Sequence, residues 1–434
     1  MGKLTRRDFA LMAAAAGVSS GLRGWSEKLP EKLPRDAPKL SVNGVDSLRV
    51  HAAAVGLLAG CAVVPQLLDL NADSSDPYTR TVLEQANILV AENSMKWSSL
   101  RPTASTYEFG PADKLFDFAA KYGQAVRGHN LCWHEQVPKW FATVATKDNA
   151  RSLLTQHIET VAGRYAGRVQ SWDVVNEAVH VEDGRPDGLR KSPWLDLIGP
   201  EYIELAFAAA AKADPKAKLT YNDYDIELDT PEQTAKRGQV LMLVRRLHAR
   251  GVPIGAIGIQ SHLQATGPQP GVGVINLIRE AAKMGLEVYV TELDVNTRKL
   301  EGGDADQDTA VAAVYKNYLG LVLPEPNVKA VLTWGITDAH TWLNQSREKW
   351  AVRSDGARQR PLPFYDDYTP APAFFALRGA LDASRKPAPP ANVTAQPKDG
   401  PTDSPARDPF APFAVPGSPG TAPAPSAPPK PPGS

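Results

Sequence analysis

The sequence predicts an α/β fold, a (β/α)8 TIM barrel that spans residues 56–384. Eight short, apolar, β-branched segments recur along this region, and longer amphipathic segments lie between them. Polar residues follow the ends of seven of the eight apolar segments, where a barrel carries its reactive groups. A doubly wound open sheet is the alternative α/β fold, but no G-x-G-x-x-G loop follows the first apolar segment.

The expected strands are short runs rich in valine, isoleucine and leucine, which is typical of parallel strands buried on both faces. In chain order they are Leu57–Val63, Ile88–Asn93, Ala125–Cys132, Val169–Asn176, Leu219–Asp223, Ala256–Ser261, Glu287–Glu292 and Val328–Trp334. Apolar residues at helical spacing predict helices between them, for example Arg151–Tyr165, Tyr202–Ala213, Pro231–Ala249, Thr309–Leu321 and, after the last strand, Ala371–Ala383.

Composition limits the partners of this chain. It has 434 residues, of which 43% are apolar, enough for one large core. The 48 Lys and Arg residues balance the 48 Asp and Glu residues, so the charge favours neither nucleic acid nor a membrane surface as partner. Beyond the N-terminus no run of about 18 apolar residues occurs, so we expect no membrane insertion of the mature protein. A neutral polymer fits this composition better.

Both ends of the chain differ from the central region. Arg6 and Arg7 precede the short apolar stretch Ala10–Val18, which predicts a twin-arginine signal peptide over residues 1–30. A basic amphipathic helix is the alternative. The signal implies export to the periplasm or the cell exterior. Residues 31–55 form a lead-in to the barrel, and the Pro-rich residues 385–434 are expected to be a disordered tail.

The chain contains two cysteines, Cys61 on the first expected strand and Cys132 on the third. Two strand spacings, roughly 9–10 Å, separate those strands, which exceeds the Cα separation of a disulfide. We therefore expect two buried thiols. The eight histidines show no H-E-x-x-H motif and the cysteines lack ligand spacing, so no metal or cofactor is expected, although calcium binding stays open.

Besides Glu92 on the second expected strand, two strand ends carry a glutamate. Glu177 follows the run Ser171–Asn176, and Glu292 ends the run Glu287–Glu292. Since parallel barrel strands end at one rim, both carboxyl groups are expected to face the same cleft. Two such carboxyl groups can cleave a glycosidic bond, because one protonates the leaving oxygen and the other attacks or stabilises the anomeric carbon.

The strand ends and the loops after them also carry carboxylates, amides, imidazoles and indoles. These residues are Glu92, Asn93, Lys96, Trp97, His129, Asn130, Trp133, His134, Glu135, Asn176, Asn222, Asp223, Tyr224, Gln260, Ser261, His262, Asp294, Trp334, Asp338 and Trp342. Side chains of these types, gathered at one rim, are typical of a cleft that binds and cuts sugars.

Seven sequence blocks occur in a fixed order: Glu92–Trp97, Arg127–His134, Trp172–Glu177, Asn222–Tyr224, Gln260–His262, Thr291–Asp294 and Trp334–Asp338. An Asn-Glu dipeptide alone carries little information, but the whole series does. It resembles glycoside hydrolase family 10, the retaining endo-β-1,4-xylanases, and the similarity covers Gly56–Ser384.

The resemblance implies Glu177 as general acid/base and Glu292 as nucleophile, with xylan and xylo-oligosaccharides as substrates. A retaining reaction requires the two carboxyl groups to lie about 5–5.5 Å apart. At that distance their repulsion is expected to raise the pKa of one of them. No cofactor is implied, and we expect a monomer.

The resemblance also implies the sugar contacts. Asn176 would bond the sugar 2-hydroxyl, although a strand-end capping amide is the alternative. His262 would orient the nucleophile, although taken alone it could equally be structural. The sugar beside the cut would contact His129, Lys96 and Gln260. The next sugar would contact Glu92 and Asn93. Trp133, Trp334 and Trp342 would stack on pyranose rings. For Trp97 and Trp172 core packing is expected, whereas Tyr224 is a weaker candidate for the leaving-group sugar.

A few residues depart from the family pattern. Cys132 replaces a common valine, Ala339–Thr341 replaces basic and tyrosyl residues, and a Pro/Gly loop occupies Gly267–Gly273. These changes leave the subsite preference open. Related glucan and mannan hydrolases are the nearest alternative, and a non-catalytic sugar-binding barrel is the alternative from another class. The group Glu92–Lys96 together with Trp342 favours xylan.

The tail can be tested by ending the chain at Ser384. We expect kinetics on soluble xylan and the Tm to stay nearly unchanged, because disordered residues contribute little core. Thermal unfolding and reducing-sugar assays of the two forms measure this. A large loss of stability would show that the tail packs on the barrel.

Overall fold

The computed structural model describes residues 41–71, 75–346 and 351–384. The predicted signal peptide, the first part of the lead-in and the predicted tail lie outside these residues. Those assignments, and the export that they imply, stay predictions.

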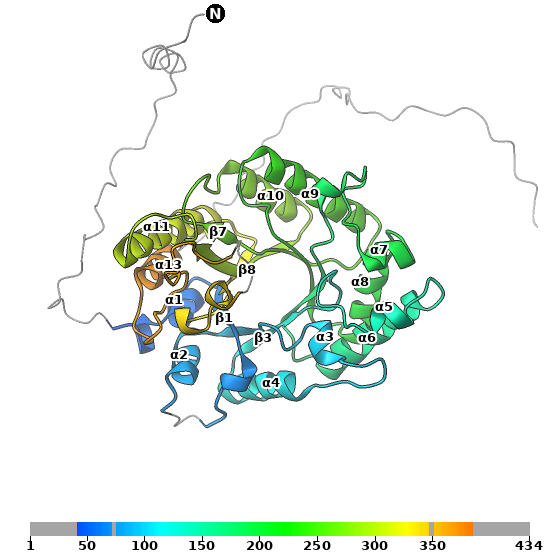
Figure 1. The fold of residues 1–434 in the computed structure, drawn as a ribbon, viewed down its shortest axis with the longest axis horizontal. Helices are drawn as coiled ribbons and strands as arrows, with labels where there is room; N and C mark the ends of the chain where they lie inside the picture. The colour runs from blue at the N-terminus through cyan, green and yellow to red at the C-terminus, as the bar shows by residue number, and fades with distance from the viewer. Residues whose placement is uncertain (1–40, 72–74, 347–350, 385–434) are drawn as a thin grey trace, which may run out of the picture. The chain divides into compact units, whose positions relative to one another are not determined.

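Eight parallel strands form a closed barrel with helices around it, as predicted (Figure 1). They are β1 Leu58–Val63, β2 Ile88–Ala91, β3 Ala125–His129, β4 Ser171–Asn176, β5 Lys218–Asp223, β6 Ala256–Ile259, β8 Glu287–Asn296 and β9 Val328–Thr333. Each strand pairs with the next barrel strand along the chain, and β9 pairs with β1 to close the ring. All strands therefore end at one rim.

Two strands end more than two residues away from the predicted position. β3 ends at His129, so Cys132 lies in the following loop and not on the strand. β8 continues past Glu292 to Asn296 and pairs there with a short extra strand, β7, His262–Gln264. Buried Leu293 and Val295 alternate with polar residues in this extension, so apolar content alone did not reveal it. The β7–β8 pair carries site residues above the barrel.

The helices agree closely with the periodicity of the sequence. In the described residues the α-helices are α1 Leu48–Ala54, α2 Pro77–Gln85, α3 Trp97–Leu100, α4 Gly110–Tyr122, α5 Phe141–Val144, α6 Ala150–Arg164, α7 Pro193–Ile198, α8 Tyr202–Ala213, α9 Pro231–Ala249, α10 Val272–Lys283, α11 Asp304–Val322, α12 Trp342–Gln345 and α13 Pro372–Ala383. Short 3₁₀ turns cover Gly44–Asp46, Pro65–Leu67, Val181–Asp183 and Asp338–His340. α11 begins at Asp304 rather than at Thr309, because the Asp306 carboxylate accepts from the Gly303 N–H and caps the added turn.

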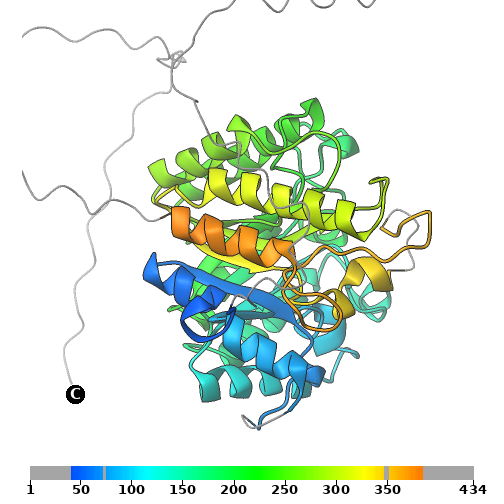
Figure 2. The same ribbon diagram turned by 90° about the vertical axis from the view of Figure 1, so that its left-hand side faces the viewer.

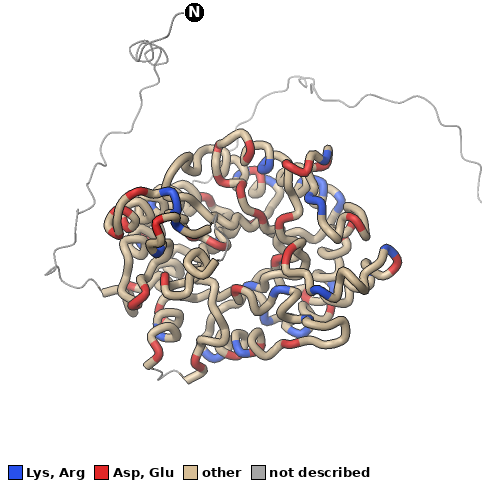
Figure 3. The backbone as a smooth tube through the Cα atoms, viewed as in Figure 1, with Lys and Arg blue, Asp and Glu red and all other residues tan. Residues whose placement is uncertain are grey.

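The first and last helices meet on the outside of the barrel. α13 lies between α1 and α11 (Figure 2). Nδ1 of His51 on α1 lies 2.6 Å from Oδ1 of Asp382 on α13. Positions of Lys and Arg alternate with positions of Asp and Glu along the backbone around the barrel (Figure 3). Within the described ranges no helix has both the length and the apolarity to cross a membrane.

The core has a layer between strands and helices and a smaller cluster inside the barrel. Trp97 and Trp172 are 3% and 0% exposed, which confirms the predicted core packing. The Trp172 ring also explains Gly128, since a Cβ there would lie 2.1 Å from the indole. Cys61 and Cys132 are buried free thiols, as expected.

Candidate active site

The backbone of Glu177 is held in an unusual conformation. This residue directly follows β4 and has a φ of 58°, a left-handed value that costs a non-glycine residue about 1–3 kcal/mol. Its N–H donates to the Asn222 carbonyl at 2.9 Å, and Arg190 Nε donates to its carbonyl at 2.8 Å. These bonds aim the carboxyl group into the rim.

Glu177 is 9% exposed, and its carboxyl group accepts three hydrogen bonds. Trp133 Nε1 donates at 2.7 Å, Gln260 Nε2 at 2.9 Å and Asn176 Nδ2 at 3.1 Å. Burial raises the pKa of Glu177, and this outweighs the Gln260 and Trp133 bonds, which lower it. A raised pKa lets the group hold a proton that it can donate.

Glu292 has the opposite electrostatic setting. Glu292 is 4% exposed. Its carboxylate accepts a 2.8 Å bond from Asn222 Nδ2, and His262 Nε2 lies 3.4 Å from its other oxygen. Burial opposes its ionisation, but the His262 bond, the charges of His129 and His262, and the Asn222 amide together lower the pKa to about 2. At neutral pH Glu292 is therefore a carboxylate.

A buried aspartate keeps His262 protonated. His262 Nδ1 lies 2.9 Å from Asp294 Oδ1, and Trp342 Nε1 donates to Asp294 Oδ2 at 2.7 Å. Burial lowers the pKa of His262, but Asp294 and Glu292 raise it well above its ordinary value. Asp294 and Glu292 lie two residues apart on β8, so they share one side of the strand. The structure thus connects Trp342 to Glu292 through Asp294 and His262.

Two amides, Asn222 and Asn176, connect the two carboxyl groups. Asn222 Nδ2 donates to Asn176 Oδ1 and to Glu292 Oε1, both at 2.8 Å, and Thr291 Oγ1 donates to Asn222 Oδ1 at 2.8 Å. Asn176 in turn bonds Glu177. Asn222 was noted as a strand-end residue but not predicted as a site residue, because its two partners lie 46 and 70 positions away.

His129 is fixed from inside the barrel. Its Nδ1 lies 2.8 Å from Asp173 Oδ2, and the Arg127 guanidinium bonds both oxygens of Asp173. Arg127 and Asp173 are fully buried, so removing either charge would leave the other buried without a partner. The orientation of His129 therefore depends on two charged residues below the rim.

The remaining predicted residues lie around the two glutamates. Lys96 Nζ donates to Asn93 Oδ1 at 2.9 Å and lies 5.1 Å from the Trp133 ring and 5.7 Å from the Trp334 ring. Burial lowers the pKa of Lys96 and raises the pKa of Glu92, so both groups are ionised less readily than in water. The rings of Trp334 and Trp342 lie 6.2 and 5.6 Å from the His262 ring.

Tyr224 is fixed beside Glu177 by two cations that sequence reasoning missed. Arg190 Nη2 donates to the Tyr224 hydroxyl at 2.8 Å, and Lys236 Nζ lies 3.4 Å from the ring centroid. Lys236 also pairs with Asp223 at 2.8 Å. Arg190 lies in a loop and Lys236 on α9, so neither carried a strand-end signal.

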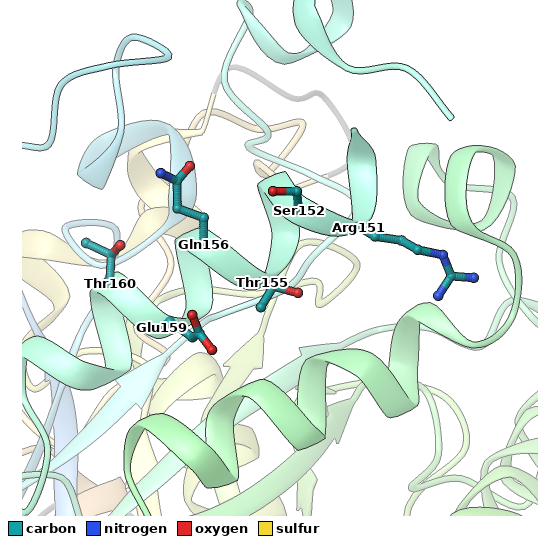
Figure 4. Close-up of a pocket in the computed structure, with 6 residues that line it drawn as sticks. All are labelled: Arg151, Ser152, Thr155, Gln156, Glu159 and Thr160. Carbon is teal, nitrogen blue, oxygen red and sulfur yellow. The ribbon is translucent and has the colours of Figure 1, made fainter. Parts of the chain in front are cut away.

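A hollow also lies on helix α6, and its lining residues differ from the residues of the rim. It follows the outer face of α6, where the side chains of Arg151, Ser152, Thr155, Gln156, Glu159 and Thr160 line it (Figure 4). None of these residues bonds to Glu177 or Glu292. Within the part of the chain that the structure describes, no cluster of three His, Cys, Asp or Glu residues could hold a metal ion.

Comparison with known proteins places this geometry in a family. Residues 47–380 match the family described as Glycosyl hydrolase family 10. A beta-1,4-xylanase of Dictyoglomus thermophilum is 38% identical over 308 residues, 69% of this chain and 83% of that protein. A thermostable celloxylanase of Thermoclostridium stercorarium is 36% identical over 327 residues, 70% of this chain and 80% of that protein.

Solved structures agree with this match. Xylanase 10B from Thermotoga petrophila RKU-1, in complex with xylobiose, superposes with a TM-score of 0.70 and 33% sequence identity. The superposition covers 78% of this chain and 98% of that one. The shared fold and sequence extend over the whole barrel.

Proposed function

This chain belongs to glycosyl hydrolase family 10 and is a glycoside hydrolase, and we propose that it is a retaining endo-β-1,4-xylanase. One observation carries the proposal. Burial favours the protonated form of Glu177, whereas hydrogen bonds and charges favour the ionised form of Glu292, and the Asn176 and Asn222 amides connect them. An acid and a nucleophile are thereby present at the same pH.

In the first step the Glu292 carboxylate attacks the anomeric carbon of the xylosyl unit at the cut. The glycosidic C–O bond breaks, and Glu177 transfers its proton to the leaving oxygen. A covalent glycosyl-enzyme remains. Protonated His262 holds the Glu292 oxygen that it contacts and stabilises charge there, while Asn176 can bond the sugar 2-hydroxyl.

In the second step Glu177, now ionised, takes a proton from water. The water oxygen attacks the anomeric carbon from the face that the leaving group vacated, and the bond to Glu292 breaks. Two inversions give net retention. Glu177 regains its proton and Glu292 its charge, so the enzyme returns to its starting state.

A β-1,4-glucan is the second candidate substrate, because the T. stercorarium relative is named a celloxylanase. The groups that favour xylan are Glu92, Asn93, Lys96 and Trp342, because the family resemblance assigns them to a pentose-accepting pattern in which a C6 hydroxymethyl group would be crowded. We expect reducing-sugar release from xylan to exceed that from carboxymethylcellulose by about tenfold or more, since pockets discriminate single carbon groups by such factors. Equal rates would support the glucan candidate, and binding without release would support a non-catalytic barrel.

A further inference from the structure

Three consecutive residues serve both catalytic carboxyl groups. Gln260 Nε2 donates to Glu177 at 2.9 Å, and His262 Nε2 contacts Glu292 at 3.4 Å. Between them Ser261 has a φ of 65°, a left-handed value that favours glycine. This conformation lets neighbouring residues reach two different carboxyl groups, so whatever holds Ser261 in place affects both.

The group that holds the Ser261 N–H is the carboxylate of Glu227, in the loop after β5. Glu227 Oε1 accepts from the Ser261 N–H at 2.8 Å, and Oε2 accepts from the Ile226 N–H at 2.7 Å. Glu227 is 2% exposed, and its hydrogen-bond partners are two backbone N–H groups rather than a cation. Above its pKa of about 7 the Glu227 carboxylate only accepts hydrogen bonds, whereas an amide side chain would turn a donor toward one of the two N–H groups at every pH.

We propose that Glu227 is a positioning residue for both catalytic carboxyl groups and acts on them through the backbone of Ser261. The inference rests on the proposed function. Glu227 touches neither carboxyl group itself; its bond to Ser261 keeps Gln260 directed at Glu177 and His262 directed at Glu292.

A contribution to folding stability does not explain why a carboxyl group is buried at position 227. Burial, with a smaller contribution from Asp225, raises the pKa of Glu227 to about 7. A carboxyl group whose pKa is higher in the folded than in the unfolded chain stabilises the folded state fully at pH values below its unfolded pKa of about 4.3. This stabilisation is lost as the pH rises through the folded pKa of about 7. At and above neutral pH the buried charge of Glu227 therefore destabilises the folded state. A carboxyl group at position 227 is therefore better explained by the turn at Ser261, whose N–H it binds.

The turn has other supports, so its loosening should not unfold the chain. Ser261 Oγ donates to the Ile259 carbonyl at 3.1 Å and lies 2.7 Å from the Tyr318 hydroxyl on α11. Glu227→Gln preserves the volume but leaves one of the two N–H groups without an acceptor. This variant should fold and place Gln260 and His262 less accurately.

The test is the pH profile of kcat/KM for an aryl xylobioside. In Glu227→Gln we expect kcat/KM to fall roughly 10- to 100-fold, with KM within about twofold, because the predicted sugar contacts other than Gln260 stay. Weaker His262 contact raises the pKa of Glu292, so the acid limb moves to higher pH. Weaker Gln260 contact raises the pKa of Glu177, so the alkaline limb moves the same way.

Asp214→Asn is the matched control. Asp214 is also fully buried and also accepts two N–H bonds, from the Gly167 backbone at 3.0 Å and from Trp172 Nε1 at 3.1 Å. It follows α8 directly, before β5 begins, and so lies outside the site. We expect this variant to lose stability without moving either limb of the pH profile.

Each result decides the inference. If Glu227→Gln only lowers the Tm, as Asp214→Asn does, and leaves both limbs in place, the inference is wrong. Should Glu227→Gln fail to fold, Glu227→Asp retains the charge with a shorter reach, and both limbs should still move upward by a smaller amount. If the wild-type enzyme does not hydrolyse the xylobioside, the proposed function fails instead, which is a separate outcome.

Discussion

Glu292→Gln is expected to lower xylan hydrolysis by roughly 10⁴-fold or more, because an amide cannot replace the attacking carboxylate. The substitution preserves the shape of the side chain, and its oxygen can still accept the Asn222 bond. Xylo-oligosaccharide binding should therefore survive. Initial rates on xylan and calorimetric titration with xylotetraose measure the two effects separately.

Glu287→Gln on the same strand is the control for this variant. Glu287 begins β8 at the opposite end from the rim, where it pairs with Lys218 at 3.2 Å. It should keep near wild-type activity. A mechanism-based 2-fluoro xylobioside should label the wild-type enzyme at Glu292 and leave Glu292→Gln unlabelled. A Glu292→Gln enzyme that retains a tenth of wild-type activity would contradict the assignment.

The strand ends of this barrel could be predicted because local pattern and function coincide there. A buried parallel strand reads as an apolar run, and the first polar residues after it lie at the rim. Glu177 after β4 and Glu292 in β8 were found in this way, and the structure brings both into one hydrogen-bonded cluster. Family resemblance then added expected roles that strand pattern alone left open.

Contacts between distant segments could not be predicted from local pattern. Arg190 holds the backbone of Glu177 from a loop, and Glu227 holds Ser261 from the loop after another strand. Asp294 was predicted at the rim but was given no role beside His262, although the alternation after Glu292 places it on the same side of the strand as Glu292. What prevented this was the assumption that β8 ends where its apolar run ends.

The cause of the raised pKa at Glu177 also differs from the expectation. Repulsion between the two catalytic carboxyl groups was expected to raise one pKa. In the structure burial is the largest cause, and Asp223 is the carboxylate that adds to it. Glu292 is meanwhile stabilised as an anion by His262. Burial depends on the whole fold, so the sequence could not indicate which cause would dominate.

Glu177→Ala separates the two halves of the proposed reaction. With an aryl xylobioside whose leaving group needs no protonation, we expect the glycosyl-enzyme to form quickly, because Glu292 and its partners are unchanged. Hydrolysis of that intermediate should be slow, because no base remains to activate water. The intermediate should accumulate, and a burst of released aryl group followed by a slow steady state would report it.

Azide distinguishes the loss of a base from general damage to the site. Azide attacks without a general base and can enter the space left by the carboxyl group, so it should restore turnover of Glu177→Ala and yield β-xylobiosyl azide of retained configuration. Gln260→Ala is the matched control: it removes the 2.9 Å partner of Glu177 but leaves the carboxyl group, so azide should neither speed it nor form an adduct. An α-azide, or no effect of azide on Glu177→Ala, would show that Glu177 is not the acid/base of a retaining enzyme.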